Sequence, residues 1–305
     1  MYQVLTKRSF SLALTAFAFA ALSGCGGSSS DSVATPTPTA TRTLSVTPVL
    51  GAVYGGTVNV YSNTGVLLGT ATTSQTDGKA SVSLSNYTPG TPVIVKVSLG
   101  TGASYFNEKK GINVTVTASD SISLLSVLPD VSVGQSVGVT PITNMAAKMA
   151  GLTVNAVGSG ALVTTVTADA IYSAVAKTNL ALGFPPSLNI LAAPVAPTVT
   201  APNPTEPLGQ ILAVMAKNTI AADPAAQAIA MAAAVNTNGT VDLANKSAIT
   251  EVNNTLTNPT IAANLIIRVT APVLEPTTAQ VTTSTTSSKE VAGKGNATSP
   301  TGAGG

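Results

Sequence analysis

The chain contains no histidine, no tryptophan and a single cysteine, and each of these scarcities excludes a class of function. Without histidine, neither Ser-His-Asp nor Cys-His activation of a nucleophile is possible, and zinc sites that need imidazole are excluded. One cysteine excludes internal disulfides and cysteine metal clusters. Aromatic residues make up only 4% of the chain, which disfavours a flat stacking surface for sugars. We therefore expect no catalytic residues, no metal site and no cofactor.

Charge is also scarce: 9% of the 305 residues are charged, against about a quarter in an ordinary globular protein. Hydrophobic residues make up 44%, which is enough for a buried core. The surface must then consist largely of Ser, Thr, Asn, Gly and Ala, without the basic patch that a nucleic-acid-binding protein needs. We expect no nucleic-acid partner.

Residues 1–24 have the organisation of a secretory signal peptide. Lys7 and Arg8 form a basic region, and an uncharged stretch of 15 residues follows at 9–23. That length suits the apolar region of a signal peptide, whereas a membrane-spanning helix needs about 20 apolar residues. We predict that this segment is removed and is not part of the fold.

The stretch ends in the tetrapeptide Leu22-Ser23-Gly24-Cys25, which resembles the lipobox of bacterial lipoproteins. The resemblance implies cleavage between Gly24 and Cys25, followed by attachment of a diacylglycerol thioether to Cys25, usually with a third acyl chain on its amino group. Two or three acyl chains anchor a protein far more durably than one. In Gram-negative lipoproteins an Asp after the Cys favours the inner membrane, so Gly26 favours the outer membrane. The predicted partner is therefore the membrane, through the lipid on Cys25.

Ordinary signal-peptide cleavage is the alternative, because Ala16-Phe17-Ala18 and Ala18-Phe19-Ala20 both have small residues at the required spacing. Cleavage there would leave Cys25 as an unpaired thiol in an oxidising compartment, which disfavours it. Cleavage before Cys25 removes two of the 14 basic residues and leaves 12, against 12 acidic residues. The lipid, rather than net charge, would then hold the protein at the membrane.

We predict an α+β protein in which an N-terminal antiparallel β-sandwich precedes a small α-helical region. The tether and the tail are assigned from compositions rich in Ser, Thr, Gly, Ala or Pro with little hydrophobic period. The predicted parts are a signal peptide at 1–24, the lipidated Cys and flexible tether at 25–42, a β-sandwich domain at 43–138, an α-helical region at 139–272 with a Pro-rich loop at 183–207, and a disordered tail at 273–305.

A period of two predicts the strands. Thr57–Ser62 and Val66–Thr72 flank the turn residues Asn63-Thr64-Gly65 and predict a hairpin. Further strands are predicted at 79–84, 92–98, 112–118 and 122–127. The stretches 60–61, 65–73 and 76–82 together resemble the prealbumin-like sandwiches of carboxypeptidase regulatory domains and bacterial Ig-like modules. This resemblance implies a role as a spacer, an assembly element or a binding domain.

A period near 3.6 predicts helices in the second half of the chain. Thr143 is the predicted N-cap of a short helix that ends at Ala150, with Gly151 as its stop. The segment 138–147 also resembles a junction in uncharacterised proteobacterial lipoproteins, where a sandwich gives way to helices. Further helices are predicted at 169–182, 207–222, 225–235 and 247–256, and Asp223-Pro224 marks the start of the third of these.

The densest mixture of aromatic and charged residues lies at 105–110, and we interpret Tyr105, Phe106, Asn107 and Glu108 as a candidate recognition loop. The alternative is a strand end with one ring in the core. The acidic residues of the chain are dispersed, and the sequence gives no pair that must come together.

The leading hypothesis is a lipid-anchored envelope protein with a non-enzymatic role in binding, adhesion or assembly, with an envelope protein or a glycan as its partner. One alternative is a carboxylate-dependent hydrolase of cell-envelope or exported glycans, which requires two carboxyl groups facing each other across a cleft. The other is a carrier of a small apolar ligand, which requires an enclosed apolar cavity.

Overall fold

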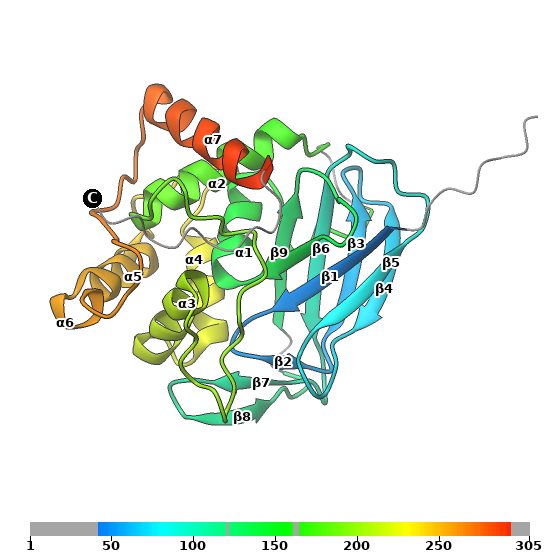
Figure 1. The fold of residues 1–305 in the computed structure, drawn as a ribbon, viewed down its shortest axis with the longest axis horizontal. Helices are drawn as coiled ribbons and strands as arrows, with labels where there is room; N and C mark the ends of the chain where they lie inside the picture. Colours follow the sequence, from blue (N-terminus) through cyan, green and yellow to red (C-terminus); the bar gives the residue numbers. More distant parts are fainter. Residues whose placement is uncertain (1–41, 120–121, 161–164, 294–305) are drawn as a thin grey trace, which may run out of the picture. The chain divides into compact units, whose positions relative to one another are not determined.

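Strands dominate the first half of the described chain and helices the second half, so the predicted α+β class is confirmed (Figure 1). The computed structural model describes residues 42–119, 122–160 and 165–293. The predicted signal peptide, the cleavage site Gly24-Cys25 and nearly all of the predicted tether lie outside these residues. Lipidation therefore stays a prediction from the sequence.

The largest sheet has four antiparallel strands in the order β4-β3-β6-β9. The predicted hairpin is present, because β3 pairs with β4 across the turn. Alternate residues of β3 face the interior, and the side chains of Val58 and Val60 are fully buried. The strands are β3 (Thr57–Ser62), β4 (Leu67–Thr72), β6 (Val93–Leu99) and β9 (Ile122–Leu128).

A second sheet has three strands in the order β10-β1-β5. Strand β1 (Arg42–Pro48) runs antiparallel to β5 (Ala80–Leu84) but parallel to β10 (Ser136–Val139). The expectation of purely antiparallel pairing is therefore wrong at β10. Parallel strands are distant in the sequence and are not joined by a short turn, so no local turn motif predicts their pairing.

A third sheet, with shorter strands, contains three of the four predicted recognition residues. Its strands are β2 (Val53–Tyr54), β7 (Ser104–Asn107) and β8 (Ile112–Thr115), and β7 pairs antiparallel with both neighbours. Tyr105, Phe106 and Asn107 thus belong to the central strand of this sheet, and Glu108 begins the turn that leads to β8.

The described part of the chain continues with seven helices, and several of them begin with a proline in the first turn. The first of them is capped by Thr140 and not by Thr143 as predicted. The two residues form a reciprocal capping box in which each side-chain oxygen accepts a hydrogen bond from the other's backbone N–H, at 3.1 and 2.8 Å. The helices are α1 (Pro141–Met149), α2 (Ala168–Leu182), α3 (Pro207–Asn218), α4 (Pro224–Ala233), α5 (Ser247–Thr257), α6 (Pro259–Ala262) and α7 (Thr278–Gly293).

Strands and helices share one hydrophobic core, so the strand region and the helical region are not separate units. Helix α1 packs against β9, the strand at the edge of the four-stranded sheet. The side chain of Asn144 accepts a 3.0 Å hydrogen bond from the N–H of Leu125, and Thr143 donates to the carbonyl of Leu125 at 3.1 Å. These bonds to buried polar groups fix α1 along the sheet edge.

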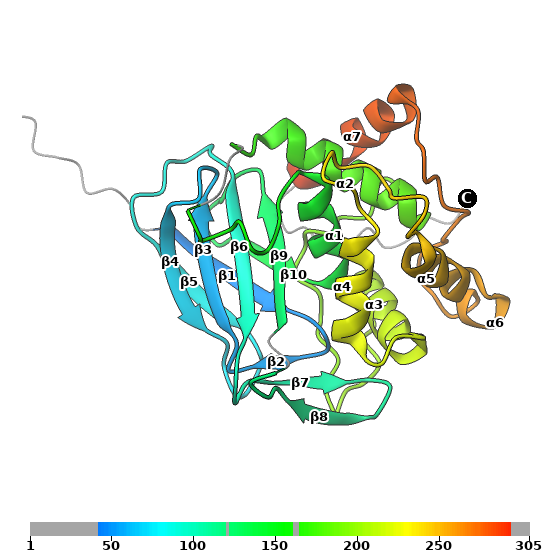
Figure 2. The same ribbon diagram turned by 180° about the vertical axis from the view of Figure 1, so that it is seen from behind.

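The predicted disordered tail is wrong for residues 278–293, which form α7. This helix lies alongside α2 in both views of the fold (Figures 1 and 2). The side chains of Ser284 and Ser288 are buried. Contact with α2, rather than an apolar stripe of its own, accounts for this helix, and composition alone does not reveal such support.

Candidate functional site

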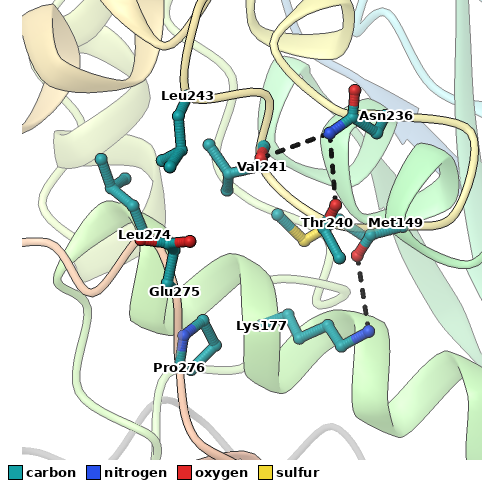
Figure 3. A pocket seen from close by; sticks show the side chains of 10 residues that line it. Met149, Lys177, Asn236, Thr240, Val241, Leu243, Leu274, Glu275 and Pro276 are labelled. Carbon is teal, nitrogen blue, oxygen red and sulfur yellow. Dashed lines mark hydrogen bonds between the residues drawn. The ribbon is translucent and has the colours of Figure 1, made fainter.

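A cleft of about 470 Å³ opens between the helices and two later segments of the chain; we call it the Lys177 cleft (Figure 3). One wall comes from the end of α1 and from α2, the second from the loop at 236–243, and the third from the segment that precedes α7. Its lining residues are Met149, Lys177, Asn236, Gly239, Thr240, Val241, Leu243, Leu274, Glu275 and Pro276.

The loop at 236–243 is a tight turn closed by an antiparallel bridge between Val235 and Val241. The N–H of Asn236 donates to the carbonyl of Thr240 at 2.8 Å. Gly239 has a φ of +74°, and a Cβ at this position would overlap the backbone carbonyl of Met149. A glycine is therefore required both for the left-handed backbone and for the close approach of the turn to α1.

Two opposite charges line the cleft. Lys177 is half-buried on α2, and its ammonium group donates a 3.4 Å hydrogen bond to the carbonyl of Gly239. Glu275 is an exposed residue of the wall that precedes α7. Within residues 42–119, 122–160 and 165–293, neither of them forms an ion pair. The cleft thus holds a cation and an anion that have no charged protein partner there.

The remaining polar groups of the cleft bond within their own loop. The amide nitrogen of Asn236 donates to the hydroxyl of Thr240 at 3.2 Å, and that hydroxyl donates to the side chain of Asn238 at 2.7 Å. Met149 and Val241 are almost fully buried and form an apolar floor. The cleft therefore combines two charges with an apolar surface, an arrangement suited to binding a small molecule.

A second cleft, of about 570 Å³, lies between the β7–β8 turn, the Pro-rich segment, α3 and the region of α6; we call it the Glu108 cleft. Several amide side chains line it, together with apolar residues and the single cation Lys217. Its lining residues are Phe106, Glu108, Gly111, Pro202, Asn203, Pro204, Gln210, Ala213, Val214, Lys217, Asn218, Thr260, Ile261, Asn264 and Leu265.

Glu108 is held by one hydrogen bond. Its Oε1 accepts from the N–H of Gly51 at 3.0 Å, whereas its Oε2 is buried without a hydrogen-bond partner among the described residues. Burial in these apolar surroundings raises the pKa of Glu108 from 4.5 to about 7, because the charged form loses its hydration. This carboxyl group therefore stays partly protonated near neutral pH.

The other predicted recognition residues are interior residues. Tyr105, Phe106 and Asn107 are 3%, 2% and 0% exposed. The ammonium group of Lys109 donates to the carbonyls of Thr219 and Ala221, at 3.0 and 3.2 Å, and ties the turn to the segment between α3 and α4. Of the four candidates, Phe106 and Glu108 line a cleft.

No motif of the sequence marks Lys177, and Glu275 is only one of its dispersed acidic residues. They lie in segments predicted as a helix and as a disordered tail, and no motif connects them. Only the packing of the segment before α7 brings Glu275 to the cleft, where the N–H of Val273 donates to the carbonyl of Leu180 at 2.8 Å. An isolated polar residue such as Lys177 on an amphipathic helix carries no signal beyond a solvated face.

Among the described residues, no cluster of three or more Asp, Glu, Cys or His side chains is placed to bind a metal ion. The helices of that part of the chain are also too short or too polar to cross a bilayer. Comparisons with protein-family models, with curated proteins and with solved structures gave no match. The geometry of the two clefts and the N-terminal sequence are therefore the features that bear on function.

Proposed function

We propose that this chain is a lipid-anchored protein of the bacterial envelope that binds a small ligand without transforming it. The lipobox Leu22-Ser23-Gly24-Cys25 supports the anchor, and Gly26 supports an outer-membrane location. In this role the acyl chains on Cys25 hold the folded domain at the membrane while the domain presents its clefts to solutes of the envelope.

The Lys177 cleft is the main support for the proposed binding role. Its volume of about 470 Å³ lies within the range of small-molecule pockets, roughly 300 to 1,000 Å³. Lys177 and Glu275 offer charge to a ligand, and Met149 and Val241 offer an apolar floor. Polar groups that orient a ligand over an apolar surface are the usual features of such a site.

The distribution of carboxyl groups supports a role without catalysis. A glycosidase needs two carboxyl groups across the scissile bond. Among the residues that the structure describes, Glu275 is the one acidic residue in the lining of the Lys177 cleft, and Glu108 is the one in the lining of the Glu108 cleft. Both clefts are open and have mixed polar and apolar linings, which is unlike the enclosed cavity of an apolar carrier.

We also propose that the three-stranded sheet β10-β1-β5 and the four-stranded sheet form a sandwich of the prealbumin-like or Ig-like type. Support comes from their inward residues: Leu44 and Val82 on the first sheet, and Val60 and Val95 on the second, are all 0% exposed and belong to the same core cluster. Such a sandwich would serve as the scaffold on which the helices build the clefts.

Two measurements test this proposal. Metabolic labelling with palmitate in a Gram-negative host should label the wild-type chain, and Cys25→Ala should lose the label and leave the membrane fraction. Equal labelling of both chains would refute the anchor. For the binding role, the purified lipidated protein should give saturable heats by calorimetry with members of a panel of amino acids, dipeptides, amines, carboxylates and sugars. Turnover of a defined glycan, abolished by Glu108→Gln or Glu275→Gln, would refute the non-enzymatic role.

A further inference from the structure

We propose that the Lys177 cleft binds a zwitterionic ligand, a free α-amino acid or a short unblocked peptide with apolar side chains. The ligand's carboxylate would pair with the ammonium group of Lys177, and its ammonium group would pair with the carboxylate of Glu275. This inference rests on the proposed binding function and names the chemical class of the ligand.

The two charges of the cleft are complementary to the two charges of a zwitterion. Lys177 and Glu275 line the same cleft, and within the described residues neither forms an ion pair. The hydrogen bond from Lys177 to the Gly239 carbonyl, at 3.4 Å, is at the long limit for an N–H donor. A lysine carries three N–H donors, so this bond leaves the ammonium group able to receive a carboxylate. A ligand with a single charge would leave one of the two protein charges without an oppositely charged partner.

Apolar side chains share the lining of the cleft with the two charges. Met149 and Val241 are each 6% exposed, and Leu243 contributes a side chain that is 41% exposed. Leu274 comes from the same wall as Glu275. An aliphatic side chain on the ligand would bury apolar area here, chiefly against Leu243 and Leu274. Neutral sugars match neither the charges nor this floor.

The volume of the cleft and the hydrogen bonds that hold its walls also suit such a ligand. The volume of about 470 Å³ is sufficient for a dipeptide as well as for a single amino acid. The turn that carries Val241 is closed by the bonds of Asn236, and the 274–276 wall is attached to α2 through Val273 and Leu180. Because hydrogen bonds within the fold hold both walls, little ordering opposes binding.

The test uses three matched probes and titration calorimetry on the lipidated protein. The probes are leucyl-leucine, which is zwitterionic, N-acetyl-leucyl-leucine, which lacks the ammonium group, and leucyl-leucine amide, which lacks the carboxylate. We expect leucyl-leucine to bind at least tenfold more tightly than either blocked probe, because each blocked probe loses one charge-assisted contact.

Variants assign each charge to its partner. Lys177→Met should lower the affinity for leucyl-leucine at least tenfold. The variant should then bind leucyl-leucine amide about as tightly as leucyl-leucine. Glu275→Gln should remove the preference over the acetylated probe in the same way. The controls are Lys79→Met and Glu290→Gln, which change the same charges at exposed positions away from the cleft and should bind leucyl-leucine like the wild type. Thermal melting of each variant checks that it is folded.

The outcomes separate this inference from the proposed function. Binding of leucyl-leucine that is unchanged in both Lys177→Met and Glu275→Gln overturns the assignment of the cleft. If all three probes fail but a singly charged or neutral member of the wider panel binds and loses affinity in Lys177→Met, the zwitterion inference is wrong and the binding function stands. If no member of that panel binds the folded protein, both are refuted.

Discussion

Glu108 and Gly51 are joined by a single 3.0 Å hydrogen bond, from the Gly51 N–H to Oε1, while Oε2 of the same carboxyl group is buried without a partner among the described residues. Gly51 makes this contact possible because its φ is +29° and a Cβ would come within 2.7 Å of the Phe106 carbonyl. The pair connects the turn after β1 to the turn after β7, and it buries an acid whose charge is poorly compensated.

The first prediction concerns pH. The pKa of Glu108 is raised from 4.5 to about 7 in the folded protein. Between these values the unfolded chain loses the proton and the folded chain keeps it, so folding becomes less favourable as pH rises from about 4.5 to about 7 and is level above that range. At about 1.4 kcal/mol per pKa unit, the loss is about 3 kcal/mol.

Urea unfolding of the wild type and Glu108→Gln at several pH values between 4.5 and 8 measures this contribution. The difference between the two proteins isolates Glu108 from the other acids, including Asp77 and Asp130, whose pKa values are lowered by hydrogen bonds to their charged forms. The glutamine variant should lack most of the decline with rising pH. Parallel stability profiles for the two proteins would show that Glu108 does not titrate in this range.

The second prediction concerns the turn of the Lys177 cleft. Gly239→Ala combines a left-handed backbone with a steric overlap against the Met149 carbonyl, so we expect a loss of more than about 2 kcal/mol in the free energy of unfolding. Gly134→Ala is the matched control, since its φ is +71° and nothing lies within 4 Å of a Cβ there. The control should lose only about 1 kcal/mol. Equal losses by chemical denaturation would contradict the contact between the turn and α1.

The third prediction concerns Tyr87, whose hydroxyl lies 2.5 Å from Oδ1 of Asp130 and accepts a 2.8 Å hydrogen bond from the N–H of Val131. Burial and Asp130 raise the pKa of Tyr87 to about 12. Tyr87→Phe would leave the buried N–H of Val131 unsatisfied, at a cost of about 1 to 3 kcal/mol. Tyr54→Phe, at a half-buried residue, should change the free energy of unfolding by less than about 0.5 kcal/mol. Similar small effects in both variants would argue against the Tyr87 network.

The sequence predicted those parts of the fold whose signals are local. Asp223-Pro224 marks the start of α4, where the Asp223 side chain accepts from the N–H of Ala226 at 2.9 Å. Asn63-Thr64-Gly65 marks the β3–β4 hairpin. In both places the residues that determine the element are its immediate neighbours, so pattern and structure agree.

The sequence did not predict parts that depend on distant contacts. The parallel pairing of β1 with β10 joins Val46 to Val137, and α7 is helical against α2 despite a composition typical of a flexible tail. The same holds for the site. Lys177 and Glu275 line one cleft only because the segment before α7 packs against α2. The aromatic pair Tyr105-Phe106, by contrast, drew attention by composition but is explained by its place in a central strand.

The last prediction asks what holds α7 in place. Among the described residues this helix has one ion pair, from Lys289 to Asp169 at 2.7 Å, and it joins side chains that are 48% and 84% exposed. Such pairs contribute between about 0 and 1 kcal/mol. Ser284, by contrast, is 2% exposed. Ser284→Lys would therefore place a charge at a buried position of α7. Hydrogen exchange measured by mass spectrometry over residues 278–291 should therefore quicken strongly in Ser284→Lys and hardly in Lys289→Met. Faster exchange in Lys289→Met than in Ser284→Lys would show that the ion pair, and not burial, retains the helix and the cleft wall that precedes it.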